Sequence, residues 1–444
     1  MSWVELGRRV GAMVVAAVVA ALALAPQAWA GAPPKRLDKN FGFVVASPHI
    51  HNIFWDSGWN AHNTFKAGSI DSFTTALVSN GYMNGLGQYG VGAANFASVT
   101  FANTACGASR TPNSVSTATV MAWAACEVSN PFSGAPLPGP RLPVSNDFYV
   151  LYLPQNTTIT DSYKIPQFSV LGHTFGPFTL AELGTSCLNF GAEHVILPTI
   201  LGFVQLAIIP TRCAAQSGSF ADITTGASHE IAEGAADAVP QGGWLDNSVS
   251  ASQRFSLGEA GDICANVSSA LVPTPPVSVN GVMFAPYWEN SPGKCGVGAA
   301  VGKFRLDAPV TTTHPGSTTS LRVTWIAPGR WRDLRTVELE VSDGKRPLTL
   351  VRFINDGSKT GLLGLGRESG KPGAARVLQA GRLSLVLSRS TVTTSGSTGK
   401  TVTIDFAVRF ARRLANHQLS LELGATDQRG NREPFRAGGA VAIR

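Results

Sequence analysis

The chain has 444 residues, a formal net charge of +7 and 44% apolar residues. It is too long for one ordinary domain, and its apolar content can fill well-packed cores, which argues against a disordered protein. Its basic residues are scattered, with no basic run between aromatic residues, so the sequence gives no support for nucleic-acid binding.

Residues 1–30 have the pattern of an export signal. An arginine pair precedes an apolar run over residues 10–25, and small residues around Ala30 mark a cleavage site. We predict cleavage after Ala30; the alternative is an uncleaved membrane anchor, because the run is close to the shortest length that spans a bilayer. No later segment is long and apolar enough to span. We therefore predict a secreted or periplasmic protein with no membrane span after cleavage.

Residues 31–305 are predicted to form one α+β domain. Strands are expected at 43–45, 50–55 and 148–153, where apolar and β-branched residues gather. A helix is expected over residues 69–80, because its apolar residues recur at spacings of three and four and Asn-Gly ends the pattern.

Two groups in this domain each allow two interpretations. His49 and His51 would share one face of a strand, where they could bind a metal ion or simply be hydrogen bonded. Trp55, Trp59 and Tyr89 could line a sugar- or peptide-binding groove, but we favour packing in the core.

Six cysteines, an even number in an exported chain, predict disulfide bonds. A four-thiolate metal site is the alternative, but no Cys-x-x-Cys spacing supports it. We prefer sequential pairing, because each loop then closes locally: Cys106 with Cys126, Cys187 with Cys213, and Cys264 with Cys295.

The residue pattern of the sequence changes near residue 310, and we predict a linker at 306–316 followed by a β-sandwich at 317–444. Apolar and polar residues alternate strictly over 401–410, and the pattern recurs around Leu385 and Leu421. Short alternating strands separated by turns are typical of an all-β, immunoglobulin-like sandwich.

An acid-rich segment lies between Cys213 and Cys264, with Arg254 as its single Lys or Arg. Carboxylates without basic partners repel one another and favour a bound cation or a shared proton. The acidic residues are Asp222, Glu230, Glu233, Asp237, Asp246, Glu259 and Asp262.

This segment contains His-Glu-x-x-Glu on a helix that we expect to begin near Thr225 or Ser228 and to end before residue 240. Residues four apart on a helix face the same way, so His229 and Glu233 can bind one ion, and zinc accepts both donor types. Glu230 occupies the place of the general base in zinc peptidases with His-Glu-x-x-His. The alternative is that the motif is part of an ordinary acidic helix surface and binds no metal.

The third metal ligand stays open between three acids. Asp237 lies about 12 Å along a straight helix from His229, which is too far unless the helix bends or ends early. Glu259 and Asp262 lie in a glycine-flanked loop that could approach the helix closely. Because the second histidine of the peptidase motif is replaced by Glu233, the bound water would be less acidic, which weakens the case for catalysis more than the case for metal binding.

Four segments together resemble exported bacterial proteins related to the plant EXORDIUM, or phosphate-induced, proteins. They are His-Glu-x-x-Glu at 229–233, Gly-Trp-Leu-Asp at 243–246, Gly-Glu-Ala-Gly-Asp-Ile-Cys at 258–264, and 282–290. The earlier segments 47–49, 53–59 and 88–90 also fit the pattern. The likeness is patchy over roughly 41–300 and does not reach the C-terminal sandwich. It implies a secreted or wall-associated protein with a zinc-peptidase-like site.

The chain departs from that pattern in two places. Ala236 and Ala238 stand where Thr and Pro are expected around Asp237, and Phe190 stands where a histidine is expected. His194 could substitute for that histidine, although its spacing differs.

We therefore predict a secreted zinc-dependent, peptidase-like hydrolase that acts on an extracellular peptide or cell-wall ligand. Its catalytic base would be Glu230, and its metal ligands His229, Glu233 and one of the three candidate acids. The alternative is a non-catalytic extracellular or cell-surface binding protein in which the metal is structural. No phosphate-binding loop supports a nucleotide cofactor.

Overall fold

The structure, a computed structural model, describes most of the chain from residue 37 to the end. The predicted export signal at 1–30 and Phe190 lie outside the described residues. The described range is 37–444 without residues 41, 137–143, 161–162, 166–167, 171–172, 176–177, 181–184, 189–190, 200–201, 239–241, 250–257, 266–273, 292, 345 and 357–358.

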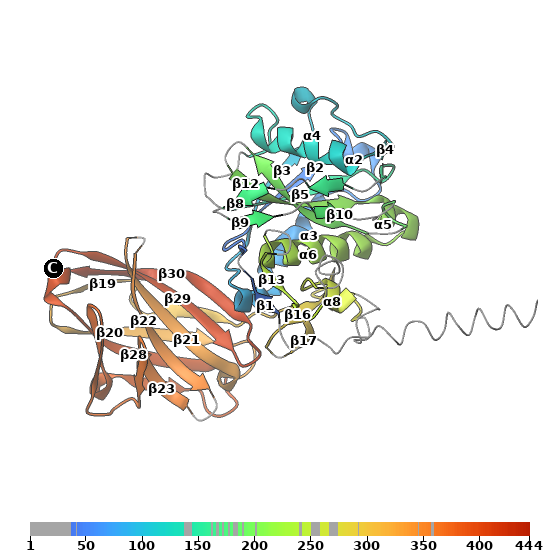
Figure 1. Ribbon diagram of the computed structural model, residues 1–444. Coiled ribbons are helices and arrows are strands. Elements are labelled where there is room, and N and C mark those ends of the chain that lie inside the picture. Colours follow the sequence, from blue (N-terminus) through green and yellow to red (C-terminus); the bar gives the residue numbers. More distant parts are fainter. Residues whose placement is uncertain are drawn as a thin grey trace, which may run out of the picture.

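Elements β1 to β17 make up what we call the N-terminal unit (Figure 1). Its strands are β1 (Asp38–Lys39), β2 (His49–Phe54), β3 (Asn95–Phe101), β4 (Ser114–Val115), β5 (Val144–Leu153), β6 (Thr158–Ile159), β7 (Tyr163–Ile165), β8 (Phe168–Val170), β9 (His173–Phe175), β10 (Phe178–Leu180), β11 (Glu193–Thr199), β12 (Gly202–Pro210), β13 (Trp244–Leu245), β14 (Val277–Val279), β15 (Val282–Phe284), β16 (Tyr287–Glu289) and β17 (Lys294–Gly296). Its helices are α2 (Trp59–His62), α3 (Ala67–Ser79), η2 (Tyr82–Tyr89), η3 (Thr104–Cys106), α4 (Thr117–Ser129), α5 (Arg212–Ser217), α6 (Phe220–Ala236) and α8 (Asp262–Ala265).

A five-stranded sheet in the order β11-β12-β5-β2-β3 is the centre of this unit. The pairs β12–β5, β5–β2 and β2–β3 are parallel, and only β11 runs antiparallel to its neighbour. Helices α3 and α6 cover one face and α4 covers the other (Figure 1). This layered α/β arrangement differs from the predicted α+β domain, because parallel strands need crossover connections that place helices on both faces.

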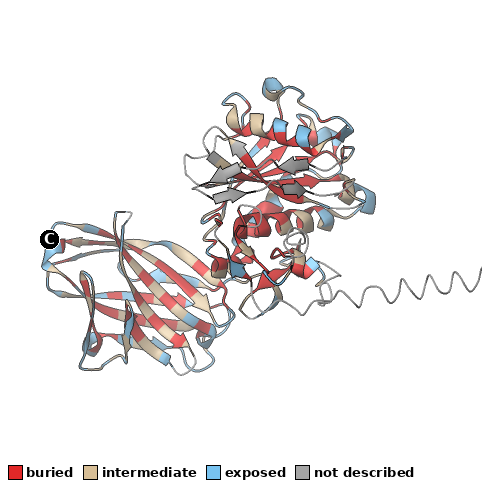
Figure 2. Cartoon of the chain, viewed as in Figure 1, coloured by how far each residue is buried: buried red, intermediate tan, exposed pale blue. Residues whose placement is uncertain are grey.

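Side chains of β5 alternate between two cores. Phe148, Val150 and Tyr152 pack with α3 and α6, whereas Tyr149 and Leu151 pack with α4. All five are completely buried, and Figure 2 shows the same burial along the middle of the sheet. A strand covered on both faces has a continuous apolar run, which explains why the position of this strand could be predicted from the sequence.

The remaining local predictions are confirmed in part. Helix α3 buries the expected apolar stripe, although it begins at Ala67, two residues before the predicted start. Strands β2 and β5 match the expected 50–55 and 148–153 closely. The expected strand at 43–45 is not one; Val45 instead donates a backbone hydrogen bond to Ala235 of α6.

Elements β18 to β30 form the C-terminal unit. They are β18 (Lys303–Leu306), β19 (Val310–Thr313), β20 (Thr318–Ile326), η4 (Trp331–Asp333), β21 (Leu334–Asp343), β22 (Arg346–Asp356), β23 (Lys359–Leu365), β24 (Glu368–Gly370), β25 (Val377–Ala380), β26 (Leu383–Val386), η5 (Leu387–Arg389), β27 (Thr391–Thr394), β28 (Thr401–Phe410), η6 (Arg412–Leu414), β29 (Gln418–Asp427) and β30 (Arg432–Ile443).

These strands form a six-stranded and a seven-stranded sheet that share one hydrophobic core, as the two layers of a sandwich do. The predicted strand at 401–410 is β28, and its apolar face is buried as expected. The prediction that 306–316 is a linker is wrong for part of this segment. Strand β18, which ends at Leu306, pairs with β20, and β19 (Val310–Thr313) pairs with β30, so only 307–309 and 314–316 lie outside the sheets; the β-branched threonines of β19 favour a strand.

Three disulfides join the predicted cysteine pairs, and no cysteine among the described residues is free. Such bonds are consistent with an extracellular or periplasmic protein. Among the described residues, no helix combines the length and the apolar character that a bilayer crossing requires. The bonds are Cys106–Cys126, Cys187–Cys213 and Cys264–Cys295.

Candidate metal centre

Helix α6 carries the His-Glu-x-x-Glu motif and starts earlier than predicted, at Phe220. Asp222 lies in its first turn, where a carboxylate is favoured by the helix dipole. His229 and Glu233 lie on successive turns, and His229 Nε2 is 3.2 Å from Glu233 Oε2. The predicted convergence of these two side chains is therefore present.

The glycine-flanked loop brings Asp262 to this pair. Asp262 begins helix α8, and its Oδ1 lies 3.6 Å from His229 Nε2. Its backbone N–H donates to Glu233 Oε1 at 2.8 Å. The approach depends on Gly261, because a Cβ atom there would lie 2.7 Å from His229 Nδ1 and 2.8 Å from Glu233 Oε1.

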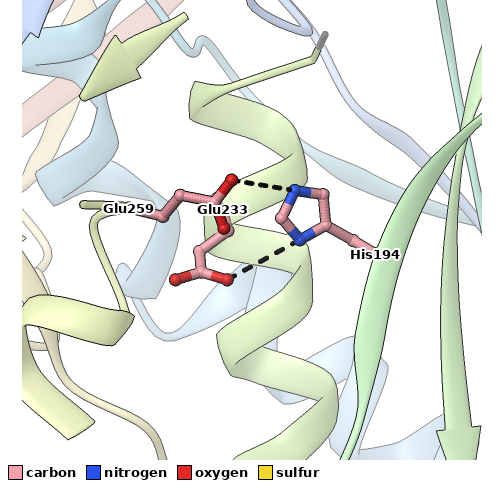
Figure 3. Close-up of side chains that lie close together, drawn as sticks. All are labelled: His194, Glu233 and Glu259. Carbon is pink, nitrogen blue, oxygen red and sulfur yellow. Dashed lines mark ion pairs between the residues drawn. The ribbon is translucent and has the colours of Figure 1, made fainter. Parts of the chain in front are cut away.

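His194, on β11, projects toward the same helix. Its Nδ1 is 3.1 Å from Glu230 Oε2 and 3.6 Å from Glu233 Oε2, and its Nε2 is 3.8 Å from Glu259 Oε1. Figure 3 shows Glu233 and Glu259 on the same side of the imidazole, each facing one of its two ring nitrogens. The sequence offered this residue only as a stand-in for a missing histidine, and strand alternation explains its direction: Val195 and Leu197 face α4, so His194 faces α6.

Two sets of side chains can each hold a metal ion. Within each set the donor atoms lie within 4.8 Å of one another, and Glu233 belongs to both. We call them the outer set, which is His229, Glu233 and Asp262, and the inner set, which is His194, Glu233 and Glu259.

Asp237 belongs to neither set, which corrects its predicted role as a ligand. Helix α6 ends at Ala236, and Asp237 is the C-cap residue. Its Oδ1 accepts hydrogen bonds from the backbone N–H groups of Gly243, at 2.6 Å, and Gly242, at 3.2 Å. These donors offset the unfavourable position of an anion at a helix C-terminus, and Asp237 therefore holds Gly242 and Gly243 at the end of the helix.

Burial and mutual repulsion shift the protonation of the acids. Burial, followed by the charges of Glu233 and Asp237, raises the pKa of Glu259 well above its usual value. Burial and Glu233 likewise raise the pKa of Asp262 to about 7. Burial alone would lower the pKa of His229, but Glu233 and Asp262 raise it well above 6.5. In the absence of an ion, protons therefore take the place of a cation.

The loop places two buried carboxylate oxygens in the centre. Glu259 Oε1 and Asp262 Oδ2 are buried and, among the described residues, have no hydrogen-bond partner. A buried carboxylate oxygen without a partner is costly, and coordination of a cation would remove that cost. The donors, imidazole nitrogen and carboxylate oxygen, suit zinc.

The other candidate groups have structural roles. His51 Nδ1 is 2.7 Å from Ser98 Oγ, and its Nε2 is 3.0 Å from Asp147 Oδ1. His49 lies 3.6 Å from the same Asp147 oxygen, and neither histidine belongs to a metal-holding set among the described residues. The favoured core placement is confirmed for the three aromatic residues, Trp55, Trp59 and Tyr89, each of which is buried.

Comparisons with known proteins add no family assignment. No protein-family model matches the chain, and no curated protein matches it significantly. The functional argument therefore depends on the geometry of the centre.

Proposed function

We propose that the protein is a secreted zinc-dependent hydrolase of the peptidase type. His229, Glu233 and Asp262 would hold the ion, and Glu230 would act as the general base. The observation that carries the proposal is the convergence of the outer set, contributed by two segments about thirty residues apart, with donor atoms within 4.8 Å of one another. The buried, unpartnered Asp262 oxygen supports it.

Each residue of the centre has a defined part in this proposal. A bound zinc ion supplies a water of lowered pKa. The carboxylate of Glu230 is 5% exposed and accepts a proton during attack, while His194 Nδ1, 3.1 Å away, holds it in position. His194 can also share that proton, because Glu230 and Glu233 raise its pKa against the effect of burial. The substrate would be an extracellular peptide or a cell-wall ligand.

A non-catalytic protein with a structural metal is the second candidate. Its supporting observation is burial: Glu233 is 2% and Glu259 3% exposed, and structural metal sites are closed to solvent. In either case the C-terminal unit, which we propose to be an immunoglobulin-like sandwich, would serve for docking or adhesion. Membership in the EXORDIUM-related family and a metallopeptidase-like N-terminal fold remain predictions from the sequence.

Metal analysis and one substitution test the proposal. The mature protein is expected to retain zinc after dialysis, and Glu230→Gln should lose peptide hydrolysis while keeping its metal and its folded structure. The matched control is Asp222→Asn, an exposed acid on the same helix that should keep full activity. Equal turnover by the wild type and Glu230→Gln would exclude Glu230 as the base. Bound metal without hydrolysis in either would favour the structural role.

A further inference from the structure

We propose that the centre holds two divalent cations, one in the outer set and one in the inner set, with Glu233 bridging them. This inference rests on the proposed function, because the outer ion is the one assigned there. It adds a second, more deeply buried ion held by His194 and Glu259.

The geometry separates the two positions. The outer and inner sets share only Glu233. The donor atoms of each set lie within 4.8 Å of one another, but the two sets taken together do not meet that limit. Donors that bind one zinc ion lie roughly 2.0–2.2 Å from it, so they cannot be more than about 4.4 Å apart. Small side-chain movements can close either set around an ion, but one ion cannot take all the donors.

Glu233 is placed to bridge. His229 Nε2 lies 3.2 Å from its Oε2, and the His194 ring lies 3.6 Å from the same oxygen at Nδ1. His194 would bind the inner ion through Nε2, the nitrogen nearer Glu259, so that Nδ1 keeps its contact with Glu230. The other oxygen of Glu233, Oε1, accepts the Asp262 N–H, which fixes the plane of the carboxylate. In hydrolases with two metals the ions lie roughly 3.5–4 Å apart, a spacing that a shared carboxylate provides.

Glu259 supplies the independent observation. Its side chain comes from the loop, faces His194 across the centre (Figure 3), and is 3% exposed. Its Oε1 has no hydrogen-bond partner among the described residues, and the nearest nitrogen, His194 Nε2, is 3.8 Å away. The outer ion would not coordinate this oxygen. A second cation between His194, Glu233 and Glu259 would coordinate it.

The charge of the centre also favours a second cation. Four carboxylates face two imidazoles, and no Lys or Arg side chain among the described residues forms an ion pair with them. With neutral imidazoles, one divalent ion offsets two of these four negative charges and a second ion offsets the other two, while the charge of Asp237 adds to the demand for cations. The groups counted are Glu230, Glu233, Glu259, Asp262, His194 and His229.

Metal stoichiometry tests the inference. The full mature protein is loaded with Zn²⁺, dialysed, and analysed for metal per chain; the expected value is two for the wild type. Glu259→Gln removes a donor only from the inner set and Asp262→Asn only from the outer set, so each should retain one ion. Glu233→Gln should weaken both. Asp222→Asn, outside both sets, should retain two.

A second measurement does not depend on any variant folding. With Mn²⁺ as the probe, two ions joined by one carboxylate give a magnetically coupled electron paramagnetic resonance spectrum, whereas separate single ions do not. One ion per wild-type chain and an uncoupled spectrum would overturn the second ion and leave the proposed function standing. No retained ion would overturn both. Loss of both ions in Glu259→Gln, with the protein still folded, would also contradict independent inner and outer positions.

Discussion

Gly261→Ala should damage the metal centre without changing a ligand. The added Cβ would lie 2.7 Å from His229 Nδ1, 2.8 Å from His229 Cε1 and 2.8 Å from Glu233 Oε1. Both side chains belong to the proposed centre, and Glu233 belongs to both sets. The new methyl group therefore displaces the imidazole, the carboxylate or the loop that carries Asp262.

The size of the effect follows from the overlap. Nonbonded carbon and nitrogen atoms attract best at roughly 3.5–4.0 Å, so the ligands or the loop must move by about 0.7 Å or more. Overpacking of this kind costs roughly 1–3 kcal/mol of stability. Because residues that orient ligands typically contribute 10–100-fold in metal affinity, we expect the zinc dissociation constant to rise by about that factor.

Competition with a chromophoric zinc chelator measures this affinity. Gly226→Ala is the matched control, because it lies on α6 and, among the described residues, its Cβ would meet Ala192 alone, at an ordinary 3.4 Å. That variant should bind zinc like the wild type and gain slightly in stability, since alanine is a better helix former than glycine. A folded Gly261→Ala protein with unchanged zinc affinity would refute the proposed ligand positions.

Three further predictions concern pH and the loop. Burial raises the pKa of Glu127 from 4.5 to about 7, so the folded state holds a proton that the unfolded state releases, and stability should fall by at most about 3 kcal/mol as pH rises from about 4.5 to about 7. Urea titrations should show this loss in the wild type but not in Glu127→Gln. Zinc affinity should increase as pH rises through about 7, because Asp262 must lose its proton to coordinate; calorimetric titrations that are flat between pH 6 and pH 8 would contradict its role. Replacing Cys264 and Cys295 together by Ser should cost roughly 3–4 kcal/mol in thermal unfolding and weaken zinc binding, because that disulfide anchors the loop of Asp262.

Local patterns in the chain specified a large part of what the structure contains. The apolar face of β28 follows from strict alternation over ten residues, since only one face of that strand meets the core. The placement of His229 and Glu233 on one helix face follows from helical periodicity. The cysteine pairing also proved local, with partners 20 to 31 residues apart. Each of these predictions depends on residues that are near in sequence.

The features that the sequence left open depend on contacts between distant segments. Only the packing of β11 against α6 brings His194, which precedes His229 by 35 positions, into contact with Glu230 and Glu233. Asp262 rather than Asp237 joins His229 and Glu233, because the backbone N–H groups of Gly242 and Gly243 bind Asp237 at the end of α6. The sequence by itself determined which residues share a helix or strand face, because periodicity is a property of the backbone. The tertiary structure alone decided the parallel strand order and which acids meet at the centre, because these depend on how whole elements bury their apolar faces against one another.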